Sequence, residues 1–162
     1  MSLINHRRRS ARWHGASQKV GQSAVPLFLD RIDIQCEISP VPFQDISKAA
    51  PGEPSAKIRE RVIKAREVQA ERFNDYKGIH CNAQMTERMI HQFAEPDEQG
   101  IELLRMAMEK FSLSARAYNR ILKVARTIAD LAGSEQIKPD HIAEAVGYGT
   151  LDRGDWAERG HL

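Results

Sequence analysis

The amino-acid sequence predicts a mainly α-helical protein, in which one β-strand precedes a bundle of four or five helices over about residues 55–150. Several segments carry apolar residues at the three- and four-residue spacing of an amphipathic helix. Residues that cap or break helices bound these segments, such as Ser114 before the longest apolar stripe and Gly133 after it. One stretch, residues 32–38, alternates instead between apolar and polar residues, which is the period of a strand.

The clearest helix is predicted over residues 114–132. The hydroxyl of Ser114 can accept a hydrogen bond from an otherwise unpaired backbone N–H of the first turn, and Gly133 ends the helix. One side is expected to be buried because it collects apolar residues at helical spacing, namely Tyr118, Ile121, Leu122, Ala125, Ile128, Ala129 and Ala132.

Three basic residues, Arg116, Arg120 and Lys123, fall together on the side opposite this stripe. The helix alone leaves two interpretations open. A charged face is the ordinary counterpart of a buried stripe, so these side chains can simply be solvated. Alternatively, an arginine held by a packed helix provides a fixed cation for a phosphate group.

Four further helices are predicted around this one. A short helix covers about residues 86–94, with Thr86 near its cap. Pro96 starts another helix, and Pro139 starts the last one. A long helix over about residues 55–76 has a densely charged surface and an apolar side formed by Ile58, Val62, Ala65, Phe73 and Tyr76.

The strand is predicted over residues 32–38, and Pro40 and Pro42 stop the alternating pattern after it. A single strand is not stable by itself. It therefore either pairs with a segment missing from this chain or is left without a partner.

The bulk composition fits one domain of ordinary size. The chain has 162 residues, of which 41% are hydrophobic, and its net charge is +2. Cys36 and Cys81 lie far apart and at no metal-type spacing, which is typical of a reduced, cytoplasmic protein. No run of about 18 apolar residues occurs that would span a membrane.

Basic residues dominate the first twenty positions, which contain no acidic residue: Arg7, Arg8, Arg9, Arg12 and Lys19. Such a run can bind nucleic acid through phosphate contacts. A disordered tail or a non-native leader is the commoner explanation, and we expect residues 1–24 to be one of these.

The motifs of common enzyme classes are missing from the sequence. It has no Gly-x-x-x-x-Gly-Lys-Ser/Thr loop to bind phosphates and no nucleophile motif built from Ser, His and Asp. His80 and Cys81 are adjacent, but adjacent side chains rarely chelate a metal together and no second pair lies at ligand spacing. We therefore predict no metal site, and no enzyme activity for the chain on its own.

Several longer runs resemble the magnesium-chelatase-like AAA+ ATPases, in particular their branch of ComM-type competence proteins. The N-terminal part of the match is Leu29-Asp30-Arg31-Ile32-Asp33-Ile34, which resembles the Leu-Asp-Arg-Ile-Asp-Ile segment of this family. The bundle resembles their C-terminal lid, and the matching runs are Val41-Pro42-Phe43, Lys64-Ala65-Arg66, Arg72-Phe73, Cys81-Asn82-Ala83-Gln84-Met85, residues 113–131, Gly133-Ser134-Glu135 and His141-Ile142-Ala143-Glu144-Ala145. The resemblance covers roughly residues 27–153, and its runs are long enough to be specific.

This resemblance implies that the chain is the C-terminal part of a ring-forming motor whose ATP-binding loop and metal-binding acid lie upstream. Residues 25–50 would be the end of the AAA+ core, residues 51–153 a helical insert plus the C-terminal lid domain, and residues 154–162 a flexible tail. The parent protein would bind ATP and Mg²⁺ and would contact its own core and neighbouring subunits, as in a hexamer. It would act on DNA during recombination or natural transformation.

The family's functional arginines match two residues of this sequence. The arginine finger, which reaches the nucleotide of a neighbouring subunit, matches Arg31, and the sensor-2 arginine matches Arg116, acting in cis or in trans. Both roles fit a guanidinium, because it is always charged and can offset charge that grows on the transferred phosphoryl group. Without the resemblance, Arg31 would be interpreted as a local ion-pair partner of Asp30 and Asp33.

Two other functions are compatible with the sequence. The ridge formed by Arg116, Arg120 and Lys123 could make the bundle a binding module for an acidic partner or nucleic acid, with binding that weakens in salt. Kinship with the chelatases also allows a subunit of a metal-insertion motor.

Overall fold

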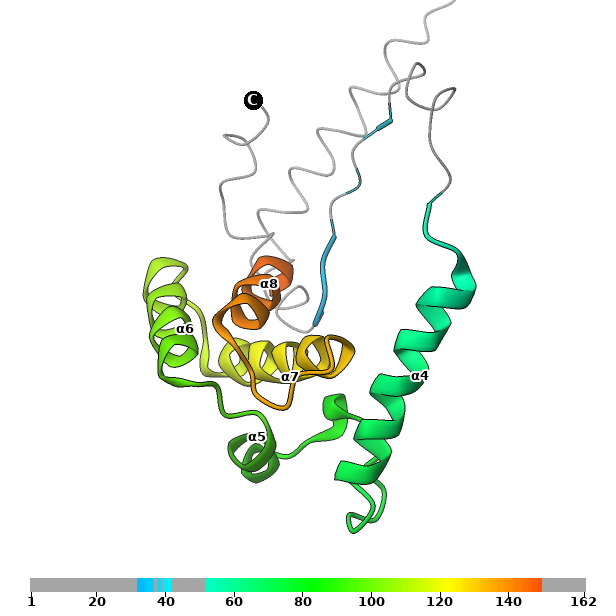
Figure 1. Cartoon of the computed structure of the whole chain (residues 1–162). Helices are drawn as coiled ribbons and strands as arrows, with labels where there is room; N and C mark the ends of the chain where they lie inside the picture. The colour runs from blue at the N-terminus through cyan, green and yellow to red at the C-terminus, as the bar shows by residue number, and fades with distance from the viewer. Residues whose placement is uncertain (1–31, 37, 39, 42–51, 150–162) are drawn as a thin grey trace, which may run out of the picture. The chain divides into compact units, whose positions relative to one another are not determined.

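The structure is a computed structural model that describes residues 32–36, 38, 40–41 and 52–149. The chain divides into two compact units, Met1–Ile32 and Asp33–Leu162, and every described helix belongs to the second unit. The mainly helical fold class is confirmed, with five α-helices and one short 3-10 helix, η1, in the described part. Figure 1 shows these elements, which are α4 (Ser55–Arg72), η1 (Asn82–Gln84), α5 (Glu87–Phe93), α6 (Glu98–Lys110), α7 (Ala115–Leu131) and α8 (Pro139–Gly149).

Helix α7 is the central element of the bundle. It contacts α4, η1, α5 and α8, while α6 packs on α8 (Figure 1). Nine of its 17 residues are buried. The predicted single buried stripe is therefore incomplete, because Arg120, Arg126 and Asp130 are buried as well, whereas Ala132 is exposed beyond the end of the helix. A helix with four neighbouring elements has little surface left for solvent.

Side-chain caps fix the starts of three helices. In each case a side-chain oxygen accepts a hydrogen bond from the backbone N–H three residues later, and the capping residues are Thr86, Asp97 and Ser114. The caps at Thr86 and Ser114 confirm the predictions. The prediction that Pro96 starts a helix is corrected by the structure, since Asp97 caps α6 and Pro96 forms an isolated parallel bridge with Ile137.

Helix α4 ends at Arg72 and not at residue 76 as predicted. The chain turns there, and Phe73 and Tyr76 pack edge-on against Phe93, with ring centroids 5.8 Å apart in both pairs. The cluster belongs to the core and its rim, because Phe73 is buried while Tyr76 and Phe93 are half-buried. The gain from packing three aromatic rings favours the turn over a longer helix.

The predicted strand is wrong for the residues that the structure describes, because Ile32–Cys36 and Ile38 are in no strand. The segment instead contacts α8, where Gln35 N donates a backbone hydrogen bond to Tyr148 O at 3.1 Å. Ile34 and Ile38 are 54% and 90% exposed, so the alternation has no buried face. A strand needs a ladder partner, and none of the described segments supplies one.

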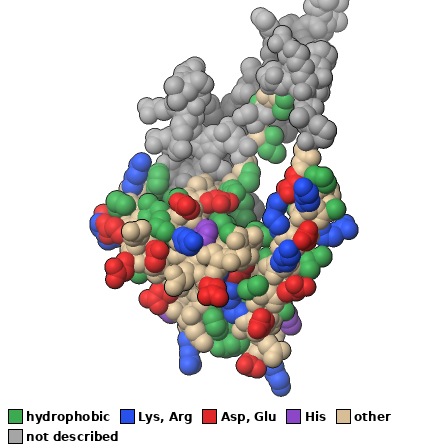
Figure 2. Space-filling model, viewed as in Figure 1, with side chains coloured by type: hydrophobic (Ala, Val, Ile, Leu, Met, Phe, Trp, Pro, Cys, Tyr) green, Lys and Arg blue, Asp and Glu red, His purple; other side chains and the backbone are tan. Residues whose placement is uncertain are grey.

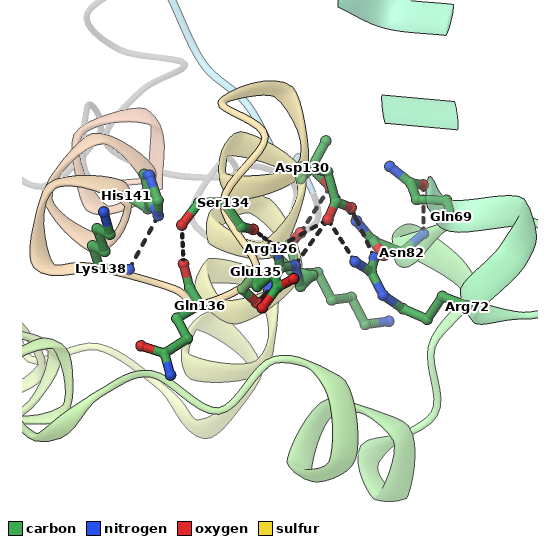
Figure 3. A network of polar contacts seen from close by, with 12 residues as sticks. Gln69, Arg72, Asn82, Arg126, Asp130, Ser134, Glu135, Gln136, Lys138 and His141 are labelled. Atoms are coloured by element: carbon green, nitrogen blue, oxygen red, sulfur yellow. Dashed lines mark hydrogen bonds and ion pairs between the residues drawn. The ribbon is translucent and has the colours of Figure 1, made fainter. Parts of the chain in front are cut away.

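A buried carboxylate, Asp130 of α7, joins three elements of the bundle (Figure 3). Arg72, at the end of α4, donates to both carboxylate oxygens at 2.6 and 2.8 Å. Arg126, one turn before Asp130, donates from Nε to Oδ1 at 3.0 Å, and Asn82 of η1 donates from Nδ2 to Oδ2 at 2.8 Å. These four residues are named the Asp130 network below.

The Asp130 network also holds the loop between α7 and α8 (Figure 3). The two terminal nitrogens of Arg126 donate to the backbone carbonyls of Glu135 and Ser134 at 2.7 and 2.5 Å. On the other side, the backbone N–H of Asn82 donates to Gln69 Oε1 of α4 at 3.1 Å. A single polar cluster thus fixes α4, η1 and the end of α7 relative to one another.

The electrostatics of the network favour the ionised carboxylate. The side chain of Asp130 is 0% exposed, and that of Arg126 is 4% exposed. Burial raises the pKa of Asp130, but hydrogen bonds from Arg72 and Asn82 and the charges of both arginines outweigh it, so the pKa lies below its ordinary value. Burial also lowers the pKa of Arg126. The buried guanidinium of Arg126 and the half-buried one of Arg72 therefore share one carboxylate.

We predict that Asp130→Asn destabilises the chain by about 3–5 kcal/mol, because it leaves the buried guanidinium of Arg126 and the half-buried one of Arg72 without their counter-charge. Urea unfolding, followed by circular dichroism, measures the change. Glu102→Gln is the matched control, because Glu102 also pairs with an arginine, Arg105, but at an exposed position. Its urea midpoint should hardly move.

The pH dependence of the same variants checks the electrostatic origin of the effect. A carboxylate whose pKa is lowered in the folded state contributes stability above its unfolded pKa, near 4, and this contribution is lost as the pH falls through the folded pKa. Below about pH 5, the free energy of unfolding of the unsubstituted chain should therefore fall more steeply with pH than that of Asp130→Asn. Parallel declines in the two proteins would mean that Asp130 is not ionised in the fold.

Candidate functional site

The turn between α6 and α7 fixes the position of Arg116, which is the second residue of α7. In this turn Leu113 N donates to Met108 O at 3.0 Å, and Ser112 adopts a left-handed φ of 48°. Ser114 then caps α7. Arg116 therefore projects from a backbone that is held on both sides.

Arg116 is exposed, and its guanidinium forms no hydrogen bond or ion pair with any residue that the structure describes. The arginines deeper in the bundle differ from it, since Arg72, Arg120 and Arg126 all donate to protein oxygens. A permanently charged group with no internal partner is available for an anion. This placement agrees with the predicted phosphate-binding role of Arg116, which stays a prediction.

The predicted basic ridge is corrected by the structure, although its three residues do share one side of α7. Arg120 is 8% exposed and donates from Nη2 to Gly149 O at the end of α8, at 3.2 Å. A Cβ at Gly149 would lie 3.3 Å from the same nitrogen, so a glycine accommodates this close approach. Lys123 is half-buried and donates from Nζ to Ala83 O at 2.9 Å. Only Arg116 of the three is exposed.

An apolar groove of about 420 Å³ lies farther along the same side of α7, between the segment Asp33–Cys36 and α8. Its walls include Ile34, Val124, Ile128 and Leu131, and Arg116 does not line it. The groove offers a packing surface and not a set of reactive groups. No group of three His, Cys, Asp or Glu side chains that could hold a metal ion occurs in the described part of the chain.

Arg31, the second predicted site residue, lies outside the described residues, so its role as an arginine finger stays a prediction. The same holds for the proposed leader, residues 1–24, and for the predicted tail, residues 154–162.

Sequence reasoning missed the Asp130 network. One signal was present, since Arg126 and Asp130 form an i,i+4 ion pair within an otherwise apolar segment of α7. The partner on α4, Arg72, lies 58 residues away in the sequence, and no local pattern points to it.

The comparison with known families identifies the class of protein. The C-terminal domain of the magnesium chelatase subunit ChlI matches residues 52–149, which include all the described helices. The chain therefore belongs to the magnesium-chelatase-like family, in its ComM-type branch.

Individual relatives agree with this assignment. Competence protein ComM of Haemophilus influenzae is 41% identical over 127 residues, which are 78% of this chain and 24% of the relative. The uncharacterized protein YifB of Escherichia coli has the same identity and coverage. The uncharacterized protein Rv2897c of Mycobacterium tuberculosis is 33% identical over 129 residues, which are 80% of this chain and 25% of that protein. The chain thus spans about a quarter of the length of these relatives.

Among the described helices, none combines the length and the apolar character needed to cross a bilayer.

We predict a large loss of stability for one arginine variant of α7 and almost none for another. Arg120→Ala should lower the free energy of unfolding by about 1–3 kcal/mol, because it removes a buried charged donor and leaves a cavity beside Gly149. Arg116→Ala should change it by no more than about 0.5 kcal/mol, because Arg116 is exposed. Thermal melting of the chain measures both changes, and Arg88→Ala on α5 serves as an exposed control. Equal destabilisation by the two α7 variants would contradict the separate placements.

Proposed function

We propose that this chain is the C-terminal lid of a ring-forming, ATP-dependent motor that acts on DNA in recombination or natural transformation in the cytoplasm. The observation that carries the proposal is the placement of Arg116. It is an exposed arginine at the start of the central helix and has no partner among the described residues, while the other arginines of the bundle core are engaged internally.

Arg116 would act as the sensor-2 arginine by binding the phosphate end of the nucleotide. The caps and packing of α7 hold its backbone, so little reorganisation accompanies the contact. The guanidinium can bind two phosphate oxygens and stays charged throughout the reaction. The start of α7 adds a partial positive potential from its unpaired N–H groups.

ATP with Mg²⁺, when bound, supplies the phosphoryl group that is transferred to water. The described residues fit only the phosphate end of this ligand, because they offer a free cation but no cluster of metal ligands. In the proposal, the ATP-binding loop and the metal ligand belong to the core of a longer parent protein. This agrees with the chain spanning about a quarter of its relatives.

The proposed partners are the parent's own core and neighbouring subunits, as in a hexamer. Arg31 would act in trans as the arginine finger of the adjacent nucleotide site, and Arg116 would act in cis or in trans. The role in DNA recombination is supported by the relative from Haemophilus influenzae, which carries the name of a competence protein. A metal-insertion motor is the alternative that the chelatase family suggests.

In the full-length parent, Arg116→Ala should reduce ATP turnover by at least about 10²-fold, because it removes a preorganised cation from the developing charge. The same substitution should leave the melting temperature of the chain nearly unchanged. A coupled assay of phosphate release measures turnover, and Arg88→Ala is the control for loss of an exposed arginine. Turnover equal to that of Arg88→Ala would contradict the sensor role.

Arg31→Ala in the parent should spare ATP binding and reduce hydrolysis by about 10³-fold, as loss of a trans arginine does. Mixed rings distinguish a trans role from a cis role. Subunits carrying Arg31→Ala should recover activity when combined with subunits that have a defective ATP-binding loop, because each then supplies what the other lacks. Co-purification of two tags confirms that mixed rings form. No recovery at any ratio would rule out action in trans.

A further inference from the structure

Among the described residues, helix α4 packs on the bundle through its C-terminal half. Its buried residues are Ala65 and Gln69, both of which lie on the side that packs on α7. The same side continues upstream through Ile58 and Val62, which are 43% and 42% exposed. The apolar stripe of α4 therefore extends beyond its contact with α7, and no described residue covers the extension (Figure 1).

The exposed surface of α4 also carries more basic than acidic residues. Arg61 pairs with Glu53, and Lys64 pairs with Glu60. Three further cations along α4, Lys57, Arg59 and Arg66, are exposed and form no ion pair with a described residue. Figure 2 shows basic, acidic and hydrophobic side chains intermixed along this edge of the molecule.

The basic and apolar residues of α4 form an ordered pattern. Arg59 and Arg66 are seven residues apart, so they lie on one side of the helix, roughly 10 Å from each other. Val62 and Ile63 lie between them, one on each flank, and both are exposed. This pattern, a row of cations between two apolar flanks, is named the α4 face.

Helix α6 carries the opposite pattern. Glu102 and Glu109 are also seven residues apart on one side of the helix, and Arg105 pairs with both. Ile101 and Met106, which are 47% and 48% exposed, lie on the two flanks of this acidic row. The row and its flanks are named the α6 face. With Glu98, which has no ion-pair partner among the described residues, the row carries more negative than positive charge.

The two faces match in three respects. The net charges of the two rows are opposite, Arg59 and Arg66 have the same seven-residue spacing as Glu102 and Glu109, and apolar side chains flank both rows. Within one copy the faces cannot meet, because α4 and α6 lie on opposite sides of α7 (Figure 1). We propose that the α4 face of one copy docks on the α6 face of a second copy of this chain.

Such a contact is heterologous, since it joins two different surfaces, and it leaves one free α4 face and one free α6 face on every pair. Contacts of this kind build rings or open chains. The proposal thereby names a surface for the subunit contact of the proposed ring, and in this respect it rests on the proposed function. A basic helix could also bind nucleic acid. The exposed apolar residues Ile58, Val62 and Ile63 instead favour a protein surface with apolar flanks as the partner.

The strength expected of the contact decides the conditions of the test. Two helix faces of a few turns bury less than the roughly 800 Å² per partner of a stable complex, so we expect a Kd of roughly 0.1 mM for the full 162-residue chain. Sedimentation velocity at low salt should then show a mass that increases with concentration between about 10 µM and 1 mM. Added salt should weaken the association, because exposed charges are screened.

Charge reversal tests the two faces separately. We expect two double variants to be monomeric: R59E with R66E on α4, and E102K with E109K on α6. The control variant, R88E on α5, should associate like the unsubstituted chain. Circular dichroism verifies that the helices remain folded. An equimolar mixture of the two reversed variants should associate again, because each face of one variant then meets an oppositely charged face on the other. A chain with all four substitutions should associate again.

Three results would overturn the proposal. The unsubstituted chain could stay monomeric at 1 mM in low salt, association could survive E102K with E109K, or the mixture of the two reversed variants could stay monomeric. A short DNA duplex is included as a probe. If R59E with R66E abolishes DNA binding and leaves the oligomeric state unchanged, the α4 face is a nucleic-acid surface and the proposal is wrong. Because none of these measurements uses nucleotide or the parent protein, their failure leaves the roles of Arg116 and Arg31 to be decided by turnover.

Discussion

The fold depends on one buried carboxylate. Asp130 has no exposed side-chain surface, and it receives hydrogen bonds from the end of α4, from η1 and from its own helix. Through Arg126 the same cluster reaches the loop that leads into α8. A core of small aliphatic side chains would allow helices to slide past one another, whereas charged hydrogen bonds have narrow geometry. The carboxylate therefore determines where α4 leaves the bundle and how α7 is oriented.

The arginines of this protein show how one residue type serves different purposes. Arg72 and Arg126 neutralise Asp130, and Arg120 binds the last carbonyl of α8. Arg116 lies one turn before Arg120 on the same helix, yet it is exposed and has no partner in the described part of the chain. Its availability comes from its place at the exposed start of α7, before the buried part of the helix.

Local patterns in the sequence predicted local structure well. The periodicity of α7 and the caps at Thr86 and Ser114 depend on neighbouring residues, and they are confirmed. The predicted strand failed because its stability requires a ladder partner that no described segment provides. The basic ridge failed because burial of Arg120 depends on α8, and the bond between Arg72 and Asp130 spans 58 residues. The role of Arg31 could be predicted only through family resemblance.

The attachment of α4 at one end has a mechanical consequence. From Arg72 to Ser55 the helix extends roughly 25 Å, and its buried residues lie in the half nearest the bundle. A rotation of about 10° around the Arg72 end would displace the first turn by roughly 4 Å. Small shifts at Asp130 would thus become larger displacements at the N-terminal end of α4. The pivot of this motion would be the ion pair between Arg72 and Asp130, so the charge of Asp130 would set how firmly α4 is held.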